Sequence, residues 1–325
     1  MLEKLESEEK ALTELLFPNL KKYWKKLEKN LERVKEDAAQ EPVHDLRVSI
    51  RRLRALVTVF QEFVPGIKNA AFLKEMRRIM KPFGGLRDLH IQHNLLSSSI
   101  EEGSTVLSPY IHSLDARIGE MEDALEKKVA AFKISSTRDL MKKILNIGQI
   151  LFPGKKKYLK MQANNHSCPV TRNLLQKYLM DCFGYFPLVR KEEKKGDFHQ
   201  LRICVKKLRY HLEILKSLID EEGPCIEIDF FRNLQDAMGD AHDRDVVSRS
   251  VREFFNRYDP SVLEREEYGK WNQSLEKERK ELYRTSLGLL EQMEKFDFFP
   301  TAPLKIENPV PQEHHQPIPV IYPPS

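Results

Sequence analysis

Cysteine is scarce in this sequence, and the few cysteines form no pattern that joins them. The 325 residues include four, all in the second half of the chain and without a C-x-x-C pair: Cys168, Cys182, Cys204 and Cys225. Cys204 falls at the edge of an apolar helical stripe, where a buried free thiol is expected. The cysteine usage therefore argues against a disulfide framework and against a zinc site.

Long apolar runs and strand patterns are also missing. No segment approaches the roughly 18 consecutive apolar residues of a membrane span. The charged residues 1–10 lack the apolar core of a signal peptide. No sustained period-two alternation bounded by turn residues predicts a strand. We therefore expect a soluble, cytoplasmic, all-α protein.

An excess of one charge sign is missing as well. Charged residues make up 32% of the chain, yet the formal net charge is only +5. Any anion-binding surface must therefore come from local clustering of basic residues rather than from a bulk excess. The 41% hydrophobic content is enough for a substantial core.

Apolar residues recur at three- and four-residue steps along most of the chain, which predicts a succession of amphipathic helices. Pro82 and Gly84-Gly85 are expected to break one helix, with Asp88 capping the segment that resumes. Gly239 is expected to interrupt a later helix, and Asp197 to cap the helix before it. The expected segments are residues 12–34, 42–64, 67–81, 88–96, 105–132, 135–150, 170–189, 197–222, a segment broken near 239, and 263–293.

One expected helix carries a basic stripe beside an apolar one. At about 100° per residue, the basic side chains fall within a sector roughly 80° wide. They are His44, Arg47, Arg51 and Arg54. The apolar stripe is centred about 130° away on the same geometry and consists of Leu46, Ile50, Leu53, Val57 and Phe60.

The same pattern returns later in the chain at an offset of 155 residues. Residues 199–209 repeat residues 44–54 position by position, with the basic stripe His199, Arg202, Lys206 and Arg209. Residues 84–88 (Gly-Gly-Leu-Arg-Asp) lie over residues 239–243 (Gly-Asp-Ala-His-Asp) at the same offset. Two blocks at one spacing predict a duplicated unit.

The stripes lack acidic neighbours that would neutralise them. Asp45 is the one acid between residues 44 and 54, and it points off the stripe; residues 199–209 contain none. Like charges one helical turn apart repel one another, so two such stripes suggest an external anion. At ~1.5 Å rise per residue each stripe is about 15 Å long, which suits a linear polyphosphate or a nucleic-acid backbone better than one small phosphate.

The doubled pattern H-x-x-R-x-x-x-[RK]-[RK]-L-R, each time followed by a G-x-x-x-D element, resembles the conserved histidine α-helical domain, the CHAD family. The resemblance covers most of residues 10 to 295. It implies two four-helix bundles related by pseudo-twofold symmetry around a basic central cavity. Family members bind inorganic polyphosphate and are associated with polyphosphate granules.

Carried over by motif match, the resemblance places the two stripes on the polyphosphate-binding surface, with no cofactor and no catalysis. The residues are His44, Arg47, Arg51, Arg54, His199, Arg202, Lys206 and Arg209. Further candidates, placed by charge and repeat position, are Lys22, Lys25, Arg77 and Arg232. Lys25 lies over Met180, so the first helices of the two repeats are not equally basic.

Three other readings stay open. His44-Asp45 and His242-Asp243 resemble the metal ligands of HD phosphohydrolases, but their repeat mates, Gln200 and Arg87, are not metal ligands. A nucleic-acid backbone would satisfy the same donors, although the stripes carry no interleaved aromatics. In a pure scaffold the arginines would instead form internal salt bridges, and for Asp88 and Asp243 we favour that structural role.

Two further motifs bear on enzymatic function. Residues 6–10 match the E-x-E-x-K signature of triphosphate tunnel metalloenzymes, but they stand at the start of a helical chain without the strands that family needs. The sequence contains no G-x-x-x-x-G-K-[ST] phosphate-binding loop, which argues against an ATP-dependent kinase.

The expected domain organisation is a first repeat with its connecting helix over residues 10–151, a second repeat over 165–297, and a tail over 298–325. The tail holds eight of the chain's 18 prolines. It is expected to be extended, either as a flexible end or as a ligand for a protein partner.

Overall fold

The computed structural model describes residues 16–64, 69–101, 107–130, 134–151, 169–190, 195–215, 228–257 and 261–295. All regular structure in these ranges is α-helical, as the sequence predicts, and it forms ten helices. Six precede residue 152: α2 (Phe17–Glu36), α3 (Gln40–Phe63), α4 (Ala70–Met80), α5 (Pro82–Glu101), α6 (Ser108–Ala130) and α7 (Ser135–Leu151). Four follow: α8 (Pro169–Val189), α9 (Lys195–Leu215), α10 (Ile228–Phe255) and α11 (Val262–Lys295). No described helix is long and apolar enough to cross a membrane.

Several sequence predictions lie outside the described residues. They are the E-x-E-x-K segment, the proline-rich tail, Cys168 and Cys225. Cys182 and Cys204 are free thiols, the former buried and the latter partly so.

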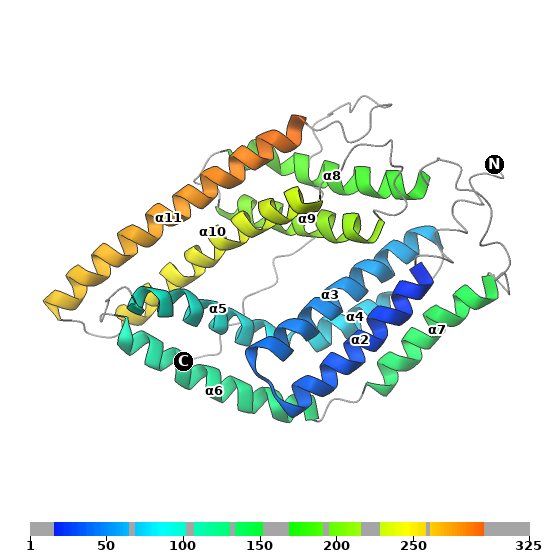
Figure 1. Cartoon of the computed structure of the whole chain (residues 1–325), viewed down its shortest axis with the longest axis horizontal. Helices are drawn as coiled ribbons and strands as arrows, with labels where there is room; N and C mark the ends of the chain where they lie inside the picture. The colour runs from blue at the N-terminus through cyan, green and yellow to red at the C-terminus, as the bar shows by residue number, and fades with distance from the viewer. Residues whose placement is uncertain are drawn as a thin grey trace.

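The helices pair mainly with their neighbours in sequence. α2 packs along α3, α5 along α6, α8 along α9 and α10 along α11 (Figure 1). Figure 1 also shows α5 and α6 reaching towards α10 and α11 at the left of the view, while α6 also contacts α2. The pairs α5–α6 and α10–α11, which are far apart in sequence, therefore lie side by side.

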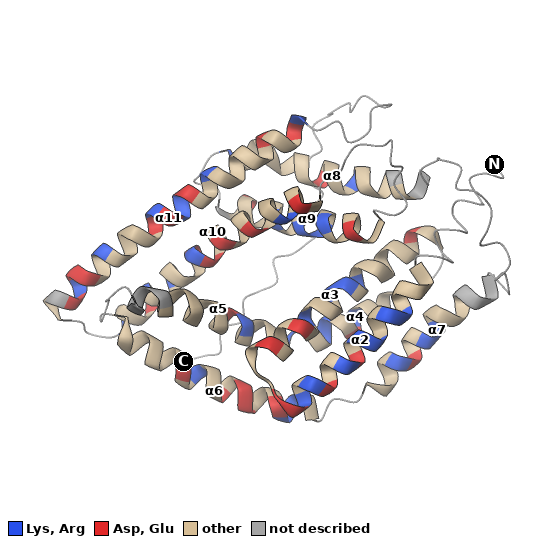
Figure 2. Cartoon of the chain, in the orientation of Figure 1, with Lys and Arg blue, Asp and Glu red and all other residues tan. Residues whose placement is uncertain are grey.

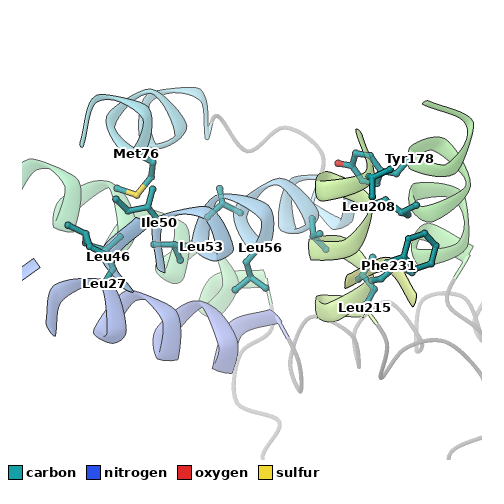
Figure 3. Close-up of a cluster of buried hydrophobic side chains, with 14 of the residues drawn as sticks. Leu27, Leu46, Ile50, Leu53, Leu56, Met76, Tyr178, Leu208, Leu215 and Phe231 are labelled. Atoms are coloured by element: carbon teal, nitrogen blue, oxygen red, sulfur yellow. The ribbon is translucent and has the colours of Figure 1, made fainter. Parts of the chain in front are cut away.

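The larger of two hydrophobic clusters surrounds α3 and α9. Leu46, Ile50 and Leu53 on α3 and Leu201 and Leu208 on α9 are completely buried in it. Figure 3 shows α3 between Leu27 of α2 and Met76 of α4, with α9 beside it. Burial of each such side chain contributes about 1.5–3 kcal/mol, so these faces fix both helices in place.

The second hydrophobic cluster joins parts of the chain that lie far apart in sequence. It combines α5 and α6 with the C-terminal half of α10 and with α11, through Leu96, Leu114, Val251 and Leu275 among others. Both clusters thus draw on helices before and after residue 152.

Two expected glycine breaks are wrong. Gly84 and Gly85 lie inside the first turn of α5, and α10 runs without interruption through Gly239. The interruption between α4 and α5 falls one step earlier, at Lys81, because Pro82 lacks the N–H that would continue the preceding helix. Asp88 consequently lies in the second turn of α5 and is not a helix cap.

Pro82 is one sequence difference that bears on the break between α4 and α5. At the offset of 155 residues Pro82 lies over Ala237, which is compatible with a continuous helix. The segment that is split into α4 and α5 therefore corresponds in sequence to the single helix α10.

Polar contacts set the register of α3 on α2. The buried Asn30 amide donates hydrogen bonds to the Ser49 hydroxyl at 2.7 Å and to the Asp45 carbonyl at 3.1 Å. Arg33 donates to the Asp45 carboxylate at 2.8 Å, which holds that acid off the basic stripe as expected. These contacts direct the basic face of α3 away from α2.

Removing the buried amide should loosen this register. We expect Asn30→Ala to lower the free energy of unfolding by about 1–3 kcal/mol, because it deletes two hydrogen bonds to buried partners. Urea denaturation of the variant measures the loss. Thr285→Ala, which removes an exposed hydroxyl bonded to the Glu281 carbonyl, should change stability by less than about 0.5 kcal/mol. Equal effects of the two changes would contradict the assigned role of Asn30.

Candidate functional site

The basic stripe of α3 faces away from the apolar core. Its arginines, Arg47, Arg51 and Arg54, are only partly exposed, whereas His44 is exposed. Arg51 Nε donates to the Arg47 carbonyl at 3.4 Å, which lays its side chain back along the helix. Figure 2 shows Lys and Arg gathered on α3 and on α9.

The stripe of α9 is set out in the same way. Val205 and Leu208 are fully buried, and His199, Arg202 and Lys206 are partly exposed. α9 contacts α3 directly. Arg51 of α3 lies close enough to both Arg202 and Lys206 to lower the pKa of each. The structure thus brings the two predicted stripes together.

Helices α5 and α10 complete the site. Each of them contacts one stripe-bearing helix, α5 on α3 and α10 on α9, and they also contact one another (Figure 1). The side chains that interact electrostatically where these four helices meet are called the central cluster. It consists of Arg47, Arg51, Arg87, Asp88, His199, Arg202, Lys206, His242 and Asp243.

Four of the five cations of the central cluster have lowered pKa values. Burial first, and then Arg51, Arg202, Arg47 and Arg209, lower the pKa of Lys206 to about 7. Burial followed by Arg51 lowers the pKa of Arg47 to about 10. The pKa values of Arg87 and Arg202 are also lowered, chiefly by burial. Partial desolvation and mutual repulsion therefore act together.

Two carboxylates only partly neutralise these five cations. Burial raises the pKa of both Asp88 and Asp243, against the opposing pull of Arg47 on the former and Arg202 on the latter. Neither carboxylate belongs to the ion pairs within 4.0 Å among the described residues. The expectation of direct salt bridges for these acids is not met, since they act on the arginines at longer range.

The histidines of the cluster are held neutral. The rings of His199 and His242 stack with centroids 4.8 Å apart. Burial and Arg202 lower the pKa of both rings, that of His242 to about 3. Partial desolvation and then Arg87 lower the pKa of His44. An anion placed here would reverse the repulsive contribution and favour the imidazolium forms.

Some polar atoms of the stripes are buried without an internal partner. Within the described part of the chain, Arg54 Nε, Arg202 Nε and His199 Nδ1 make no hydrogen bond. Buried donors of this kind normally have partners, so these atoms mark places where an acceptor would stabilise the protein.

The remaining predicted residues are placed differently. Arg209 is nearly buried and pairs with Glu213, one turn further along α9, and Arg232 pairs with Asp229 on the surface of α10. Lys22 and Lys25 are exposed on α2, which packs most extensively on α3. Arg77, exposed on α4, lies close enough to lower the pKa of Arg54. Apart from the effect of Arg209 on the pKa of Lys206, these residues act outside the central cluster.

Sequence reasoning missed Arg87 as a member of the site. It lowers the pKa of His44 and of Arg47 and interacts with Asp243 across the helix interface. The sequence did contain a signal for it. Arg87-Asp88 lies over His242-Asp243 at the repeat offset, so each repeat places a basic residue type directly before an aspartate.

Metal ligation was the chemistry expected of an HD-type site. Among the described residues, no group of three or more His, Cys, Asp or Glu side chains is arranged to hold a metal ion.

A family model and at least two solved structures match the chain. A family model described as the CHAD domain matches residues 19–252. The fold is similar to the crystal structure of the CHAD domain from the plant Ricinus communis, with a TM-score of 0.56 and 18% identity over 87% of this chain and 88% of that one. It is also similar to PptA from Streptomyces chartreusis, with a TM-score of 0.60 and 13% identity over 87% and 99% of the two chains. No curated protein sequence matches the chain.

Lys206 should make stability depend on pH. Its folded pKa of about 7 lies below the ordinary 10.5, so between these values the unfolded state binds more protons. Stability should therefore rise with pH across this window. We expect Lys206→Met to be more stable than the wild type at pH 7, with the difference shrinking towards pH 10. Urea midpoints of both proteins at each pH measure it, and a constant difference would contradict the shifted pKa.

Proposed function

The chain belongs to the CHAD domain family, and we propose that it binds inorganic polyphosphate at the central cluster without catalysing a reaction on it. The observation that carries the proposal is the convergence of five partly desolvated cations from three helices, opposed by only two carboxylates. A surface of this kind is stabilised by an anion of several charges.

The geometry supports a chain-like anion. Four of the five cations come from two helices that contact one another, and each predicted stripe extends over about 15 Å of helix axis. Successive phosphates of a linear polymer can meet successive guanidinium groups, whose planar donor forks suit phosphate oxygens. Neutral His199 and His242 add ring nitrogens that gain protons when negative charge approaches.

The central arginines should carry the affinity. We expect Arg47→Gln with Arg202→Gln to weaken binding of long-chain polyphosphate by about 100-fold, since each loses charge-assisted hydrogen bonds worth about 1.5 kcal/mol or more. The salt dependence of log K should become shallower by about 0.7–0.9 per residue. Calorimetric titration at two salt concentrations measures both quantities.

A control pair removes equal charge elsewhere. Arg138 and Arg190 are exposed and pair with Glu28 and Glu294, so changing both to Gln should leave affinity within about twofold. The central variant should also be no less stable than wild type, because it relieves repulsion. Unchanged affinity in the central variant, or equal losses in both, would contradict the proposed site. Equal or tighter binding of single-stranded RNA of matched charge would point to a general polyanion surface instead.

Binding should also take up protons. Polyphosphate beside Lys206 raises the pKa of its ammonium from about 7, so above pH 7 the complex holds more protons than the free protein. Affinity should therefore fall as pH rises from 7 to 9. Titrations at pH 8 in two buffers of different ionisation enthalpy measure the uptake, which Lys206→Gln should reduce. Heats that do not depend on the buffer would count against contact with Lys206.

A further inference from the structure

The basic stripe of α3 continues beyond the central cluster. Arg54 lies two turns after Arg47, about 10 Å along the helix axis. Its buried Nε makes no hydrogen bond among the described residues. Burial and then Arg77 of α4 lower the pKa of Arg54, and among the described residues neither arginine forms an ion pair with an acid. Arg77 itself is exposed. The positive surface therefore extends from α3 onto α4.

The equivalent end of α9 is neutralised within the protein. Arg209, which lies over Arg54 at the offset of 155 residues, has a side chain only 10% exposed. It donates to Glu213 and, through Nε, to Gln235 at 2.9 Å, and it stacks over the Tyr210 ring at 4.5 Å. The Arg209 guanidinium therefore bonds to partners within the protein.

The same contrast applies to the outer pair of arginines. Arg232, which lies over Arg77 at the repeat offset, forms an ion pair with Asp229 one turn before it. Arg77 belongs to no ion pair among the described residues.

The sequence encodes this difference at two positions. Glu213 and Asp229 lie over Thr58 and Lys74 at the offset of 155 residues. The Thr58 hydroxyl donates to the Arg54 carbonyl, and it carries no negative charge that would neutralise the Arg54 guanidinium. The second repeat thus has two acids that pair with its arginines. The first repeat has a neutral residue and a further cation at the same two positions.

We propose that a long polyphosphate chain leaves the central cluster on one side only, across Arg54 and Arg77 over α3 and α4. Glu213, which also lies 4.0 Å from Arg52 of α3, and Asp229 neutralise the equivalent arginines at α9 and α10. This inference rests on polyphosphate binding at the central cluster. Short oligophosphates occupy the cluster alone, and the extension makes the site selective for long chains.

Two probes of different length test the extension. We expect Arg54→Gln with Arg77→Gln to weaken binding of long-chain polyphosphate by at least tenfold while changing the affinity for tripolyphosphate less than twofold. The matched control is Arg232→Gln alone, an exposed and paired residue, which should change neither affinity by more than twofold. Equal losses for both probes in the double variant, or a tenfold long-chain loss in the control, would overturn the inference.

A second test introduces acidic residues on α3 and α4 and leaves the partly buried Arg54 in place. Thr58→Glu with Lys74→Asp installs the acids of α9 and α10 on α3 and α4. It should abolish the preference for long chains and leave tripolyphosphate binding intact. Retention of the full preference would contradict the one-sided path. Circular dichroism melts of each variant verify that the fold is kept.

The central variant separates this inference from the proposed function. If Arg47→Gln with Arg202→Gln loses both probes, polyphosphate binding at the cluster stands. In that case, an unchanged long-chain preference in the Arg54 and Arg77 variant refutes only the extension. If the central variant binds both probes as well as wild type does, the proposed function itself fails, and the extension with it.

Discussion

Mutual repulsion among cations at the centre of the molecule is the constraint on which the rest of the structure depends. Burial lowers the pKa of Arg47, Arg202 and Lys206, and the charge of Arg51 lowers each of these pKa values further. The apolar faces of α3 and α9 offset that cost, because they are buried completely on the opposite sides of the same helices. The protein therefore holds an arrangement of charges that its own side chains stabilise only in part.

Helix periodicity made most of the fold predictable from the sequence. The basic and apolar stripes of α3 lie on the two sides of the helix that a spacing of 100° per residue predicts. The glycine breaks were not predictable in this way, because tertiary packing overrides a low helix propensity. A Cβ at Gly85 would stand 3.3 Å from Met121 of α6, so the small residue serves close packing inside a continuous helix. The boundaries of the two repeats stay predictions.

The composition of the site was predictable only in part, for a related reason. Arg209 shares the stripe spacing, but its pairing depends on Glu213, one turn beyond the repeated motif. Arg87 lies outside both stripes and joins them only because α5 crosses onto α3 and α10. A periodic pattern defines which residues share one helix face. It contains no information on which faces meet, since that follows from how α5, α9 and α10 pack around α3.

The second hydrophobic cluster has a consequence for the order in which the chain folds. Leu96 of α5 and Leu114 of α6 are buried against Val251 and Leu275, more than 130 residues later in the sequence. During synthesis the paired helices α5 and α6 are complete long before α10 and α11 leave the ribosome. Their apolar faces stay without a native partner throughout that interval, which is when binding by chaperones is most needed.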